Sequence, residues 1–509
     1  METPRTPVQP VLWSGWGDPG KATGLDPAVR ELLAESLGVV PPAGEPAGFG
    51  DVRLPATELS PFVLDSLRSI VGAEQVRTDA DARIRHTRGK STPDLLKMRM
   101  GDGSDAPDAV VLPASHHEIA GLLSVCTAER VAVVPFGGGT SVVGGVVADR
   151  AGFAGVVALD LRRLDRLVSV DEESMLAELQ PGLRGPQAEE LLNGHGLTLG
   201  HFPQSWEYAT LGGFAAARSS GQASAGYGRF DDMVEGLTVA TPAGDLELGR
   251  APRSAAGPDL RQLILGSEGA FGVITSMRLR VRRLPAERRW DAWRFPSFQA
   301  GRDAMRALAQ ERRLPSVIRL SDETETMING GTGCLMVIGY EQGDPPRFPG
   351  AEHLGAAPAE RWADGRFAAP YLRDALLGAG ATVETLETAA HWSGLPRLYE
   401  AVRLALEAAL GRAIVMCHVS HVYETGASLY FTVATASGDD PLARWDAAKT
   451  KVSEAIGLAG GTISHHHGVG RDHRAAYAAE IGPVGVGIMR AIKKSLDPAG
   501  ILNPGVLIP

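Results

Sequence analysis

Three adjacent histidines stand in the segment TISHHHGVGR, residues 462–471. Imidazole titrates near neutral pH, so such a tract can transfer protons or bind a phosphate group. Alternate residues of an extended segment point to opposite sides, so we expect His465 and His467 to face one side and His466 the other. The same composition is typical of a surface metal-binding tract or a buried polar cluster, and only its surroundings separate these alternatives.

Glycine-rich segments lie beside short apolar runs at three places. Residues 131–145 (VAVVPFGGGTSVVGG) predict a strand that leads into a glycine loop, residues 211–232 concentrate small residues, and residues 263–275 place three glycines before an apolar strand. Missing side chains let main-chain N–H groups approach a diphosphate or a flat ligand. Each segment alone is also typical of a tight turn, but three together indicate an extended cofactor. The first loop lacks the P-loop lysine and the dinucleotide spacing, which argues against ATP and classical NAD.

The composition is that of a large, acidic, globular protein. The chain has 509 residues, of which 44% are hydrophobic and 22% charged, with a formal net charge of -10. This length predicts roughly two to four folding units and favours an enzyme, while the negative charge argues against a nucleic-acid partner. The three cysteines, Cys126, Cys334 and Cys417, are too far apart in sequence to suggest a disulfide framework or a thiolate metal site.

Neither end of the chain resembles a targeting segment. The first residues, METPRTPVQPVLWSGWGDPG, lack the basic and apolar regions of a secretory signal, and the last residues, VLIP, differ from the peroxisomal signal SKL. No apolar run predicts a transmembrane helix. We expect a cytoplasmic protein and leave peripheral membrane association open.

Short strands that alternate with helices must position the glycine and histidine segments. Helical spacing of apolar residues predicts helices over 27–37 and 60–71. The following region predicts strands at 109–113, 131–139, 155–162, 167–170 and 175–179, with helices over 115–129 and 185–194.

The pattern changes after Pro285, where we place a boundary. Beyond it, the strand-like runs RRWDAWRF, CLMVIGYE and SLYFTVAT alternate with helices such as 397–410, and residues 475–496 predict a final helix. We therefore predict an α+β protein with four parts: a helical N-terminal arm (1–103), a cofactor domain (104–284), a substrate domain (285–470) and a C-terminal helical segment (471–509).

Three motifs occur in a specific order: PFGGGTS at 135–141, PQSWEYATLGGFAAARSSG at 203–221 and GSEGAFGVIT at 266–275. They resemble the FAD-binding domain of the vanillyl-alcohol oxidase and p-cresol methylhydroxylase (PCMH) superfamily. The resemblance implies a two-part PCMH-type FAD-binding domain and an α+β substrate (cap) domain with an antiparallel sheet. Because no His or Cys falls within 131–145, we expect FAD to be bound noncovalently.

The same resemblance implies which residues contact FAD. They are Pro135, Phe136, Gly137, Gly138, Gly139, Thr140, Ser141, Gln204, Ser205, Trp206, Glu207, Tyr208, Ala209, Thr210, Ala217, Arg218, Ser219, Ser220, Glu268, Gly269, Ala270, Phe271, Gly272, Val273 and Ile274.

Further motifs extend the resemblance nearly end to end: LWSGWGDP at 12–19, SVIRLSD at 316–322, PYLRD at 370–374, HVYETGASLYFTV at 421–433 and SHHHGVG at 464–470. Together they resemble the alkyldihydroxyacetone-phosphate synthase (alkylglycerone-phosphate synthase) family of ether-lipid enzymes. The resemblance implies that Arg319 is required for activity, Arg373 binds substrate and Tyr430 is the acid/base. It also implies that His465, His466 and His467 form the active-site cluster, without a metal.

The implied reaction replaces the acyl chain of acyl-dihydroxyacetone phosphate with a long-chain alcohol, without net electron transfer. Tyr430 assists proton removal at C1, a flavin N5 adduct forms as the fatty carboxylate leaves, and the alcohol then adds to give the ether. The expected partners are these two substrates and a second copy of the chain in a homodimer.

Two alternatives compete with this interpretation. An FAD-dependent D-2-hydroxy acid dehydrogenase or oxidase of the same superfamily would commonly carry an HxGDGNLH-like segment and a later EHG, which bind a divalent metal. Here His418, His421 and Glu424 stand without GDGN, and no glutamate precedes His467, which disfavours a hard-metal site. A noncatalytic flavin-binding or lipid-binding protein would keep the glycine loops but would need none of the proton-transfer residues.

Overall fold

A four-stranded sheet follows the N-terminal region and leads into the first glycine loop. The computed structural model describes residues 1–7, 11–42, 44–147 and 149–509. The strands β1 (Val76–Arg77), β2 (Ala109–Val111), β4 (Val156–Asp160) and β3 (Ala132–Phe136) lie in the order β1-β2-β4-β3. β2 and β3 run parallel to β4, and apolar residues of α2 (Pro61–Val71) and α5 (His116–Ala128) share a buried core with them. The glycine loop begins directly after β3.

An antiparallel five-stranded sheet lies beside it. Its order is β5 (Leu167–Asp171), β6 (Leu176–Leu179), β10 (Val273–Arg280), β8 (Val234–Thr241) and β9 (Gly244–Leu248). Five short helices accompany it: α6 (Gly185–Asn193), α7 (Leu211–Ala217), α8 (Ser224–Tyr227), α9 (Phe230–Met233) and α10 (Arg261–Ile264). A two-stranded ladder joins β7 (Leu197–Thr198) to β11 (Arg282–Arg283). The third glycine segment ends where β10 begins.

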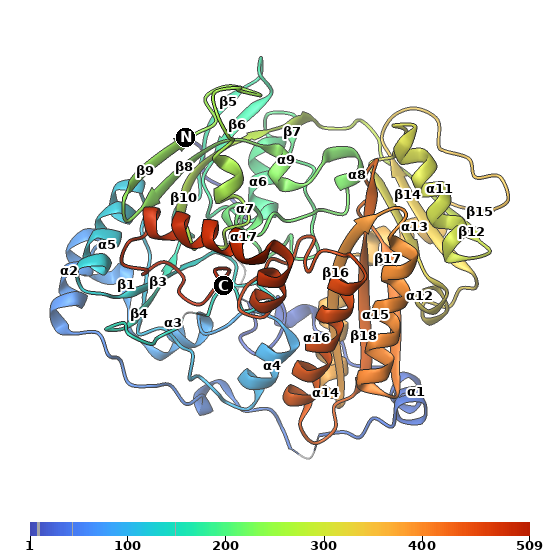
Figure 1. Ribbon diagram of the computed structural model, residues 1–509, viewed down its shortest axis with the longest axis horizontal. Helices are drawn as coiled ribbons and strands as arrows, with labels where there is room; N and C mark the ends of the chain where they lie inside the picture. Colours follow the sequence, from blue (N-terminus) through green and yellow to red (C-terminus); the bar gives the residue numbers. More distant parts are fainter. Residues whose placement is uncertain (8–10, 43, 148) are drawn as a thin grey trace.

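A seven-stranded antiparallel sheet forms the other half of the molecule (Figure 1). Its order is β15 (Glu352–Gly355), β12 (Arg289–Phe295), β14 (Cys334–Tyr340), β13 (Val317–Ser321), β17 (Ala413–Val419), β18 (Gly426–Ala436) and β16 (Ala381–His391). The helices α11 (Phe298–Gln310), α12 (Glu323–Ile328), α13 (Ala357–Gly365), α14 (Ala369–Gly378), α15 (Leu395–Leu410) and α16 (Pro441–Leu458) connect these strands.

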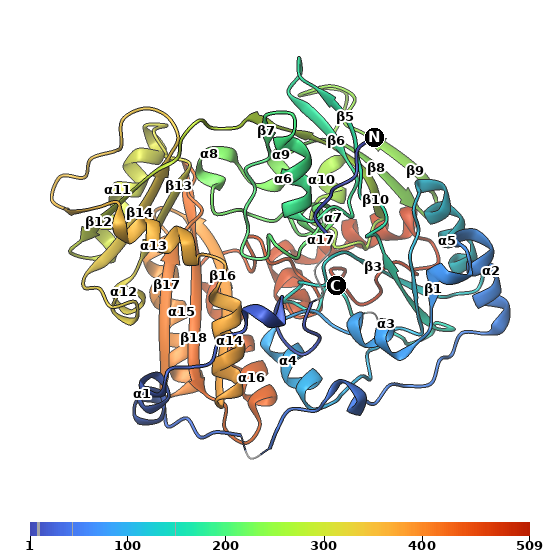
Figure 2. The ribbon, with the colours of Figure 1, turned by 180° about the vertical axis from the view of Figure 1, so that it is seen from behind.

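Strand alternation gives this sheet two different faces. Met336 and Ile338 of β14 belong to the large core under α11, α15 and α16, whereas Val337 between them packs against Ala359 of α13. Figures 1 and 2 show the two faces: α15 and α16 in front in one view, α13 and α14 in front in the other. The face under α13 and α14 is the one that meets the glycine loops.

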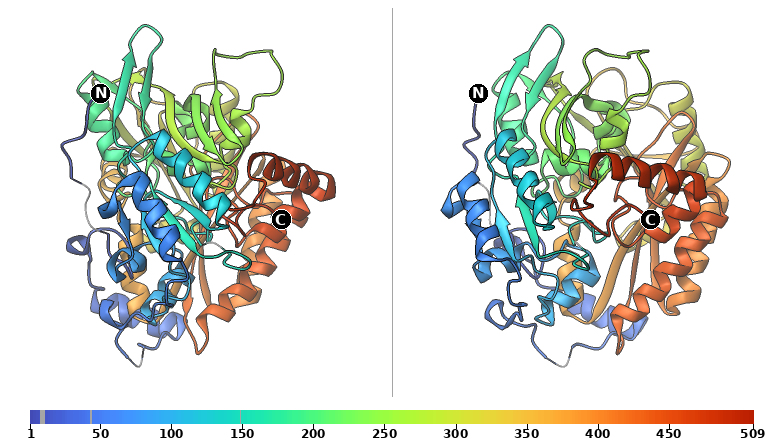
Figure 3. Two further views of the ribbon diagram at one scale, coloured as in Figure 1. Left: turned by 90° about the vertical axis from the view of Figure 1, so that its left-hand side faces the viewer. Right: turned by 60° about the vertical axis from the view of Figure 1, so that its left-hand side comes forward.

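Both ends of the chain connect the two halves. The N-terminal region holds η1 (Pro19–Lys21), α1 (Pro27–Leu37), η2 (Phe49–Asp51), η3 (Ala73–Gln75), α3 (Ala80–Arg85) and α4 (Thr92–Arg99), and α1 packs on β16 and β18. α17 (Arg474–Leu496) bends at Gly482 and Pro483. Tyr477 in its first part packs on both cores, and Met489 in its second part packs on the five-stranded core. Figure 3 shows this helix in dark red.

The α+β class, the antiparallel cap sheet and the PCMH-type arrangement are confirmed. The helix predicted over 60–71 begins at Pro61 because Ser60 is its N-cap, and the helix over 185–194 ends at Asn193. The bend in the final helix was not predicted. The limits of the four parts stay a prediction, and none of the helices in the described ranges has the length and apolarity needed to span a bilayer.

α15 offers a test of the large core. Leu406 is fully buried, whereas Leu404 of the same helix is 54% exposed. We expect Leu406→Ala to lower the free energy of unfolding by about 2–5 kcal/mol, because it removes buried methyl groups and leaves a cavity. Leu404→Ala should change it by less than about 0.5 kcal/mol. Urea denaturation compares the two, and equal effects would contradict this packing.

Candidate active site

A cavity of about 800 Å³ lies between the glycine loops and the seven-stranded sheet. One wall consists of the three glycine segments. The opposite wall includes Arg319, His418 and Tyr430 of the sheet together with Arg373 of α14. A cavity of this size with a few converging polar groups is typical of a ligand site.

Most of the residues predicted to contact FAD do line this cavity. They are Pro135, Phe136, Gly137, Gly138, Gly139, Thr140, Ser141, Gln204, Ser205, Ala209, Thr210, Ala217, Ser219, Ser220, Glu268, Gly269, Gly272, Val273 and Ile274.

Six predicted contacts lie behind this wall. Trp206 stacks on Phe367, Glu207 pairs with Lys21, and Tyr208 packs against Trp16. The other three are Arg218, whose guanidinium donates to the carbonyls of Gln262 and Leu265, and Ala270 and Phe271, which are buried in the core of the five-stranded sheet. Most of the predicted residues therefore line the cavity, whereas these six side chains pack behind the cavity wall.

The glycine wall fits a diphosphate-bearing cofactor such as FAD. A Cβ on Gly138 would lie 2.0 Å from the carbonyl oxygen of Tyr208, so only glycine allows this close approach. Among the described residues, the N–H groups of 137–141 donate to no main-chain oxygen. Nε2 of Gln204 is also buried without a hydrogen-bond partner. These donors can bind an anion, so the glycine wall fits the diphosphate of FAD.

Tyr430 is the centre of a polar row across the sheet. It lies opposite Glu387 of β16 and opposite His418 of β17, so the three side chains share one face. The rings of His418 and Tyr430 stack with centroids 4.9 Å apart. Burial raises the pKa of the Tyr430 hydroxyl to about 12, while Thr385 and Arg373 act to lower it. The hydroxyl is therefore protonated at neutral pH.

Glu387 fixes the histidine segment above this row. Its buried carboxylate accepts hydrogen bonds from the N–H groups of His465, His466 and His467 at 2.6, 3.1 and 2.9 Å, and from Oγ of Ser464 at 2.7 Å. Although burial acts to raise it, the three histidines hold the pKa of Glu387 well below its usual range. A buried carboxylate needs such partners, so the loop folds around it.

The prediction that the three histidines alternate in direction is wrong, because the loop bends around Glu387 and is not extended. His466 and His467 line the cavity, with ring centroids 6.0 and 5.5 Å from that of Tyr430. His465 points behind them and bonds the Tyr423 hydroxyl through Nε2 at 2.7 Å.

Glu268 of the third glycine segment fastens the rest of the same loop. Its carboxylate accepts hydrogen bonds from the N–H groups of Val469 at 3.0 Å and of Gly470 at 2.9 Å. Burial raises the pKa of Glu268 to about 7, and the two N–H groups oppose this shift. Residues 464–470 thus connect one carboxylate of the seven-stranded sheet to one of the glycine wall.

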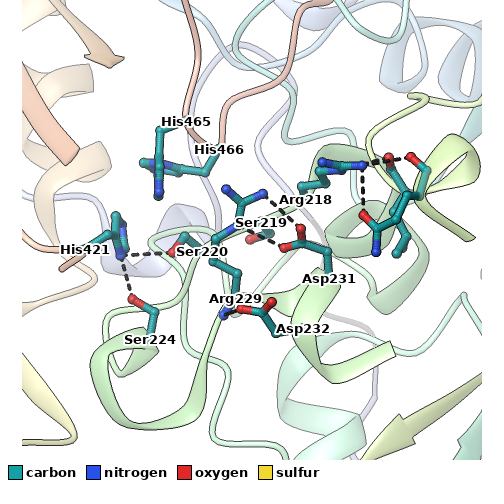
Figure 4. Close-up of polar contacts among 12 residues, drawn as sticks. Arg218, Ser219, Ser220, Ser224, Arg229, Asp231, Asp232, His421, His465 and His466 are labelled. Atoms are coloured by element: carbon teal, nitrogen blue, oxygen red, sulfur yellow. Dashed lines mark hydrogen bonds and ion pairs between the residues drawn. The ribbon is translucent and has the colours of Figure 1, made fainter. Parts of the chain in front are cut away.

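His421 completes a cluster of buried imidazoles (Figure 4). Its Nδ1 is 3.0 Å from Oγ of Ser220 and 2.8 Å from Oγ of Ser224, and its ring stacks on that of His465. Burial lowers the pKa values of His465, His466 and His467 to about 4 and that of His421 well below its usual value. The rings are therefore neutral at pH 7 and act as hydrogen-bond donors and acceptors.

This cluster is also where a transition metal could bind. One ring nitrogen from each of His421, His465 and His466 lies within 4.8 Å of the others. Nδ1 of His421 already bonds Ser220 and Ser224, Nε2 of His465 bonds Tyr423, and no carboxylate belongs to the group. The expectation of a metal-free site stays a prediction.

Both predicted arginines lie in the cavity wall. Arg319 donates to Glu325, and its Nη2 is 3.0 Å from Nδ1 of His418. Although burial acts to raise it, Arg319 and His418 hold the pKa of Glu325 well below its usual range. Arg373 donates to the carbonyl oxygen of Lys90 at 2.6 Å and to Oδ1 of Asp374 at 2.9 Å. Both guanidinium groups are thus oriented by fixed acceptors.

Sequence reasoning missed Glu325, Glu387 and the structural role of His418 and His421. The two glutamates stand in the runs SDETET and TVETLET, which carry no recognisable motif. The sequence presents the two histidines only as metal-ligand candidates with Glu424, and the strand and turn composition around them favours coincidence. Knowledge of which strand pairs with which would have placed Glu387 and His418 beside Tyr430.

The neutral state of His465 makes stability depend on pH. Its pKa is about 4 in the folded protein, against about 6.5 in an unfolded chain. Between pH 7 and pH 5 the unfolded chain binds a proton that the folded protein does not. The free energy of unfolding therefore decreases as the pH falls. From pH 7 to pH 5 the free energy of unfolding of wild type should fall by roughly 2 kcal/mol more than that of His465→Gln.

Urea denaturation of both proteins at pH 7 and pH 5 measures this difference. His117→Gln, which alters an exposed histidine of α5, should behave as wild type. A His465→Gln protein with the pH dependence of wild type would show that His465 is not held neutral.

Known families match both halves of the chain. The family model described as FAD binding domain matches residues 107–248, and the one described as FAD linked oxidases, C-terminal domain, matches residues 351–507. The alkyldihydroxyacetonephosphate synthase of Dictyostelium discoideum is 31% identical over 98% of this chain and 94% of its own length. That of Trypanosoma brucei brucei is also 31% identical, over 98% of this chain and 92% of its own.

A solved structure of an alkyldihydroxyacetonephosphate synthase superposes with a TM-score of 0.82 at 28% identity, over 97% of this chain and 98% of the other. These similarities run through the glycine wall, the cap sheet and the histidine loop alike. The chain therefore belongs to the alkyldihydroxyacetonephosphate synthase family, within the PCMH-type superfamily of FAD-linked enzymes.

Proposed function

We propose that this protein is an FAD-dependent alkyldihydroxyacetonephosphate synthase that replaces the acyl chain of acyl-dihydroxyacetone phosphate with a long-chain alcohol. The observation that carries the proposal is the position of Tyr430. Its side chain lines the same cavity as Arg373, His466, His467 and the glycine wall. The residues needed for proton transfer and for phosphate binding therefore face one space.

Tyr430 transfers the proton at C1 of the substrate. The hydroxyl sits among neutral imidazoles, with the rings of His418 and His466 stacked against its own. Tyr430 acts as a base in its phenolate form, which the hydrogen bond to Thr385 stabilises. His466 and His467 line the same cavity as neutral hydrogen-bond partners for the substrate.

Arg373 binds the phosphate, and Arg319 orients the polar end of the substrate. A guanidinium fork matches phosphate with two parallel N–H bonds. The sheet-side wall also contains Leu335, Trp362 and Leu372, which provide apolar surface for the chains. In the net exchange the C1–O bond to the acyl group breaks and a C1–O bond to the alcohol forms, and the released fatty acid takes up the alcohol's proton.

FAD, when bound in the glycine wall, supplies the covalent chemistry at the substrate carbon without net electron transfer. Residues 137–141 would hold its diphosphate. We infer noncovalent binding, because no cysteine is among the described residues that line the cavity and the histidines there already serve the cluster around Tyr430.

The same proposal includes a cytoplasmic location. It also includes peripheral contact with a lipid surface, because both substrates carry long apolar chains. Val484 and Ile488 of α17 are 76% and 56% exposed and offer apolar surface for such a contact. The homodimer expected for the family stays a prediction.

The proposal is tested with FAD-loaded enzyme, palmitoyl-dihydroxyacetone phosphate and hexadecanol under anaerobic conditions, with the product identified by mass spectrometry. We expect ether product from wild type and a loss of about 10²- to 10⁴-fold in rate for Tyr430→Phe, because the proton-transfer group is gone. Tyr340→Phe, which removes a hydroxyl from β14 outside the cavity wall, should keep the wild-type rate.

Two outcomes would overturn the proposal. Full ether synthesis by Tyr430→Phe would remove Tyr430 from its role. Flavin reduction by D-2-hydroxy acids without any ether product would instead indicate the dehydrogenase branch of the superfamily.

A further inference from the structure

The motif LWSGWGDP near the N-terminus has no part in the proposed chemistry. In the structure, residues 12–21, which we name the strap, lie beside α4 and α14 (Figure 2, dark blue). Trp16 of the strap is buried, lines the cavity and meets the Tyr208 ring edge-on at 5.6 Å. The strap is therefore a piece of the cavity wall.

The main chain of the strap is bound to α14, the helix that carries Arg373. The N–H of Trp16 donates to Oδ2 of Asp374, and Oδ1 of the same carboxylate accepts from Nε and Nη2 of Arg373 at 3.2 and 2.9 Å. Arg99 joins the same two elements by donating to the carbonyl oxygens of Ser14 and Asp374. Asp374 thus connects the strap to Arg373 through its two oxygens.

Lys90 joins the strap to the glycine wall. Its Nζ donates to the carbonyl oxygens of Leu12 at 2.7 Å and Trp13 at 3.0 Å. Its main-chain N–H donates to the carbonyl oxygen of Ser141 at 2.7 Å. Its own carbonyl oxygen accepts from Arg373. Lys90 is only 5% exposed, so its ammonium depends on the strap for these partners.

Gly15 lets the strap lie this close. A Cβ there would stand 2.7 Å from Oδ2 of Asp374. A Cβ on Gly24, just beyond the strap, would meet no atom within 4 Å. The two glycines therefore form a matched pair for mutation.

We propose that the strap is a positioning element, which fixes the guanidinium of Arg373 for the phosphate end of the substrate; the inference rests on the proposed function. With the strap in place, Asp374 and Lys90 hold the guanidinium on three of its nitrogens. A guanidinium group that is already oriented binds phosphate without a further loss of side-chain rotational freedom. Displacing the strap weakens phosphate binding and leaves the proton transfer at Tyr430 intact.

The test compares Gly15→Ala and Asp374→Asn with Gly24→Ala and wild type, all loaded with FAD. We expect the first two to raise the KM for acyl-dihydroxyacetone phosphate roughly tenfold, with kcat within about twofold of wild type. Gly24→Ala should match wild type in both. An unchanged KM in both Gly15→Ala and Asp374→Asn would overturn the inference.

A double-mutant cycle with Arg373→Ala separates positioning from general damage. In that background Gly15→Ala should cause no further rise in KM, because the group that it positions is absent. A rise of the same factor in both backgrounds would show that the strap acts elsewhere and would overturn the inference.

Calorimetric titration with dihydroxyacetone phosphate, which needs no turnover, gives a second readout. We expect Gly15→Ala and Asp374→Asn to bind it roughly tenfold more weakly than wild type. Wild type that binds it but forms no ether would contradict the proposed function alone. Equal binding by wild type and both variants would contradict the role of the strap alone.

Discussion

A buried carboxylate must be compensated, and in this protein Glu387 is compensated by the loop that carries the histidines. Three successive N–H groups and the Ser464 hydroxyl surround it, so the loop has little freedom to adopt another path. Glu268 of the glycine wall accepts the N–H groups of Val469 and Gly470 further along the same loop. The two halves of the molecule thereby hold residues 464–470 between them, and the cavity depends on this double attachment.

The same constraint determines the chemistry of the site. Because the loop is buried, its imidazoles are neutral, and the ring of Tyr430 stacks on one of them. Arg319 and Arg373 both carry positive charge in the wall, and each is oriented by a carboxylate that the fold fixes in turn. The proposed function therefore assigns proton transfer and phosphate binding to different residues of one cavity, in a medium where fixed dipoles interact strongly.

Local patterns predicted what depends on local physics. The glycine segments, the helices predicted over 27–37 and 60–71 and the strand-like runs RRWDAWRF, CLMVIGYE and SLYFTVAT all follow from the preferences of a few adjacent residues, and the structure has helices and strands at these places. The direction of the three histidines could not be predicted in this way, because it is imposed by Glu387, whose place beside Tyr430 follows from strand pairing. Trp206, Glu207 and Tyr208 illustrate the same limit: the motif faces the cavity, yet these side chains point away from it.

The most direct test of the role of Glu387 is the rate of ether formation by the Glu387→Gln variant loaded with FAD. The change keeps the shape of the side chain but replaces one accepting oxygen with an NH₂ group that faces N–H donors. We predict that FAD stays bound and that the rate falls about 100-fold or more, as expected when a preorganised polar group is lost. Ser464→Ala, which removes a single hydrogen bond to the same carboxylate, should give a smaller loss in the same direction. A wild-type rate for Glu387→Gln with a full complement of FAD would contradict the claim that this carboxylate positions the active-site loop.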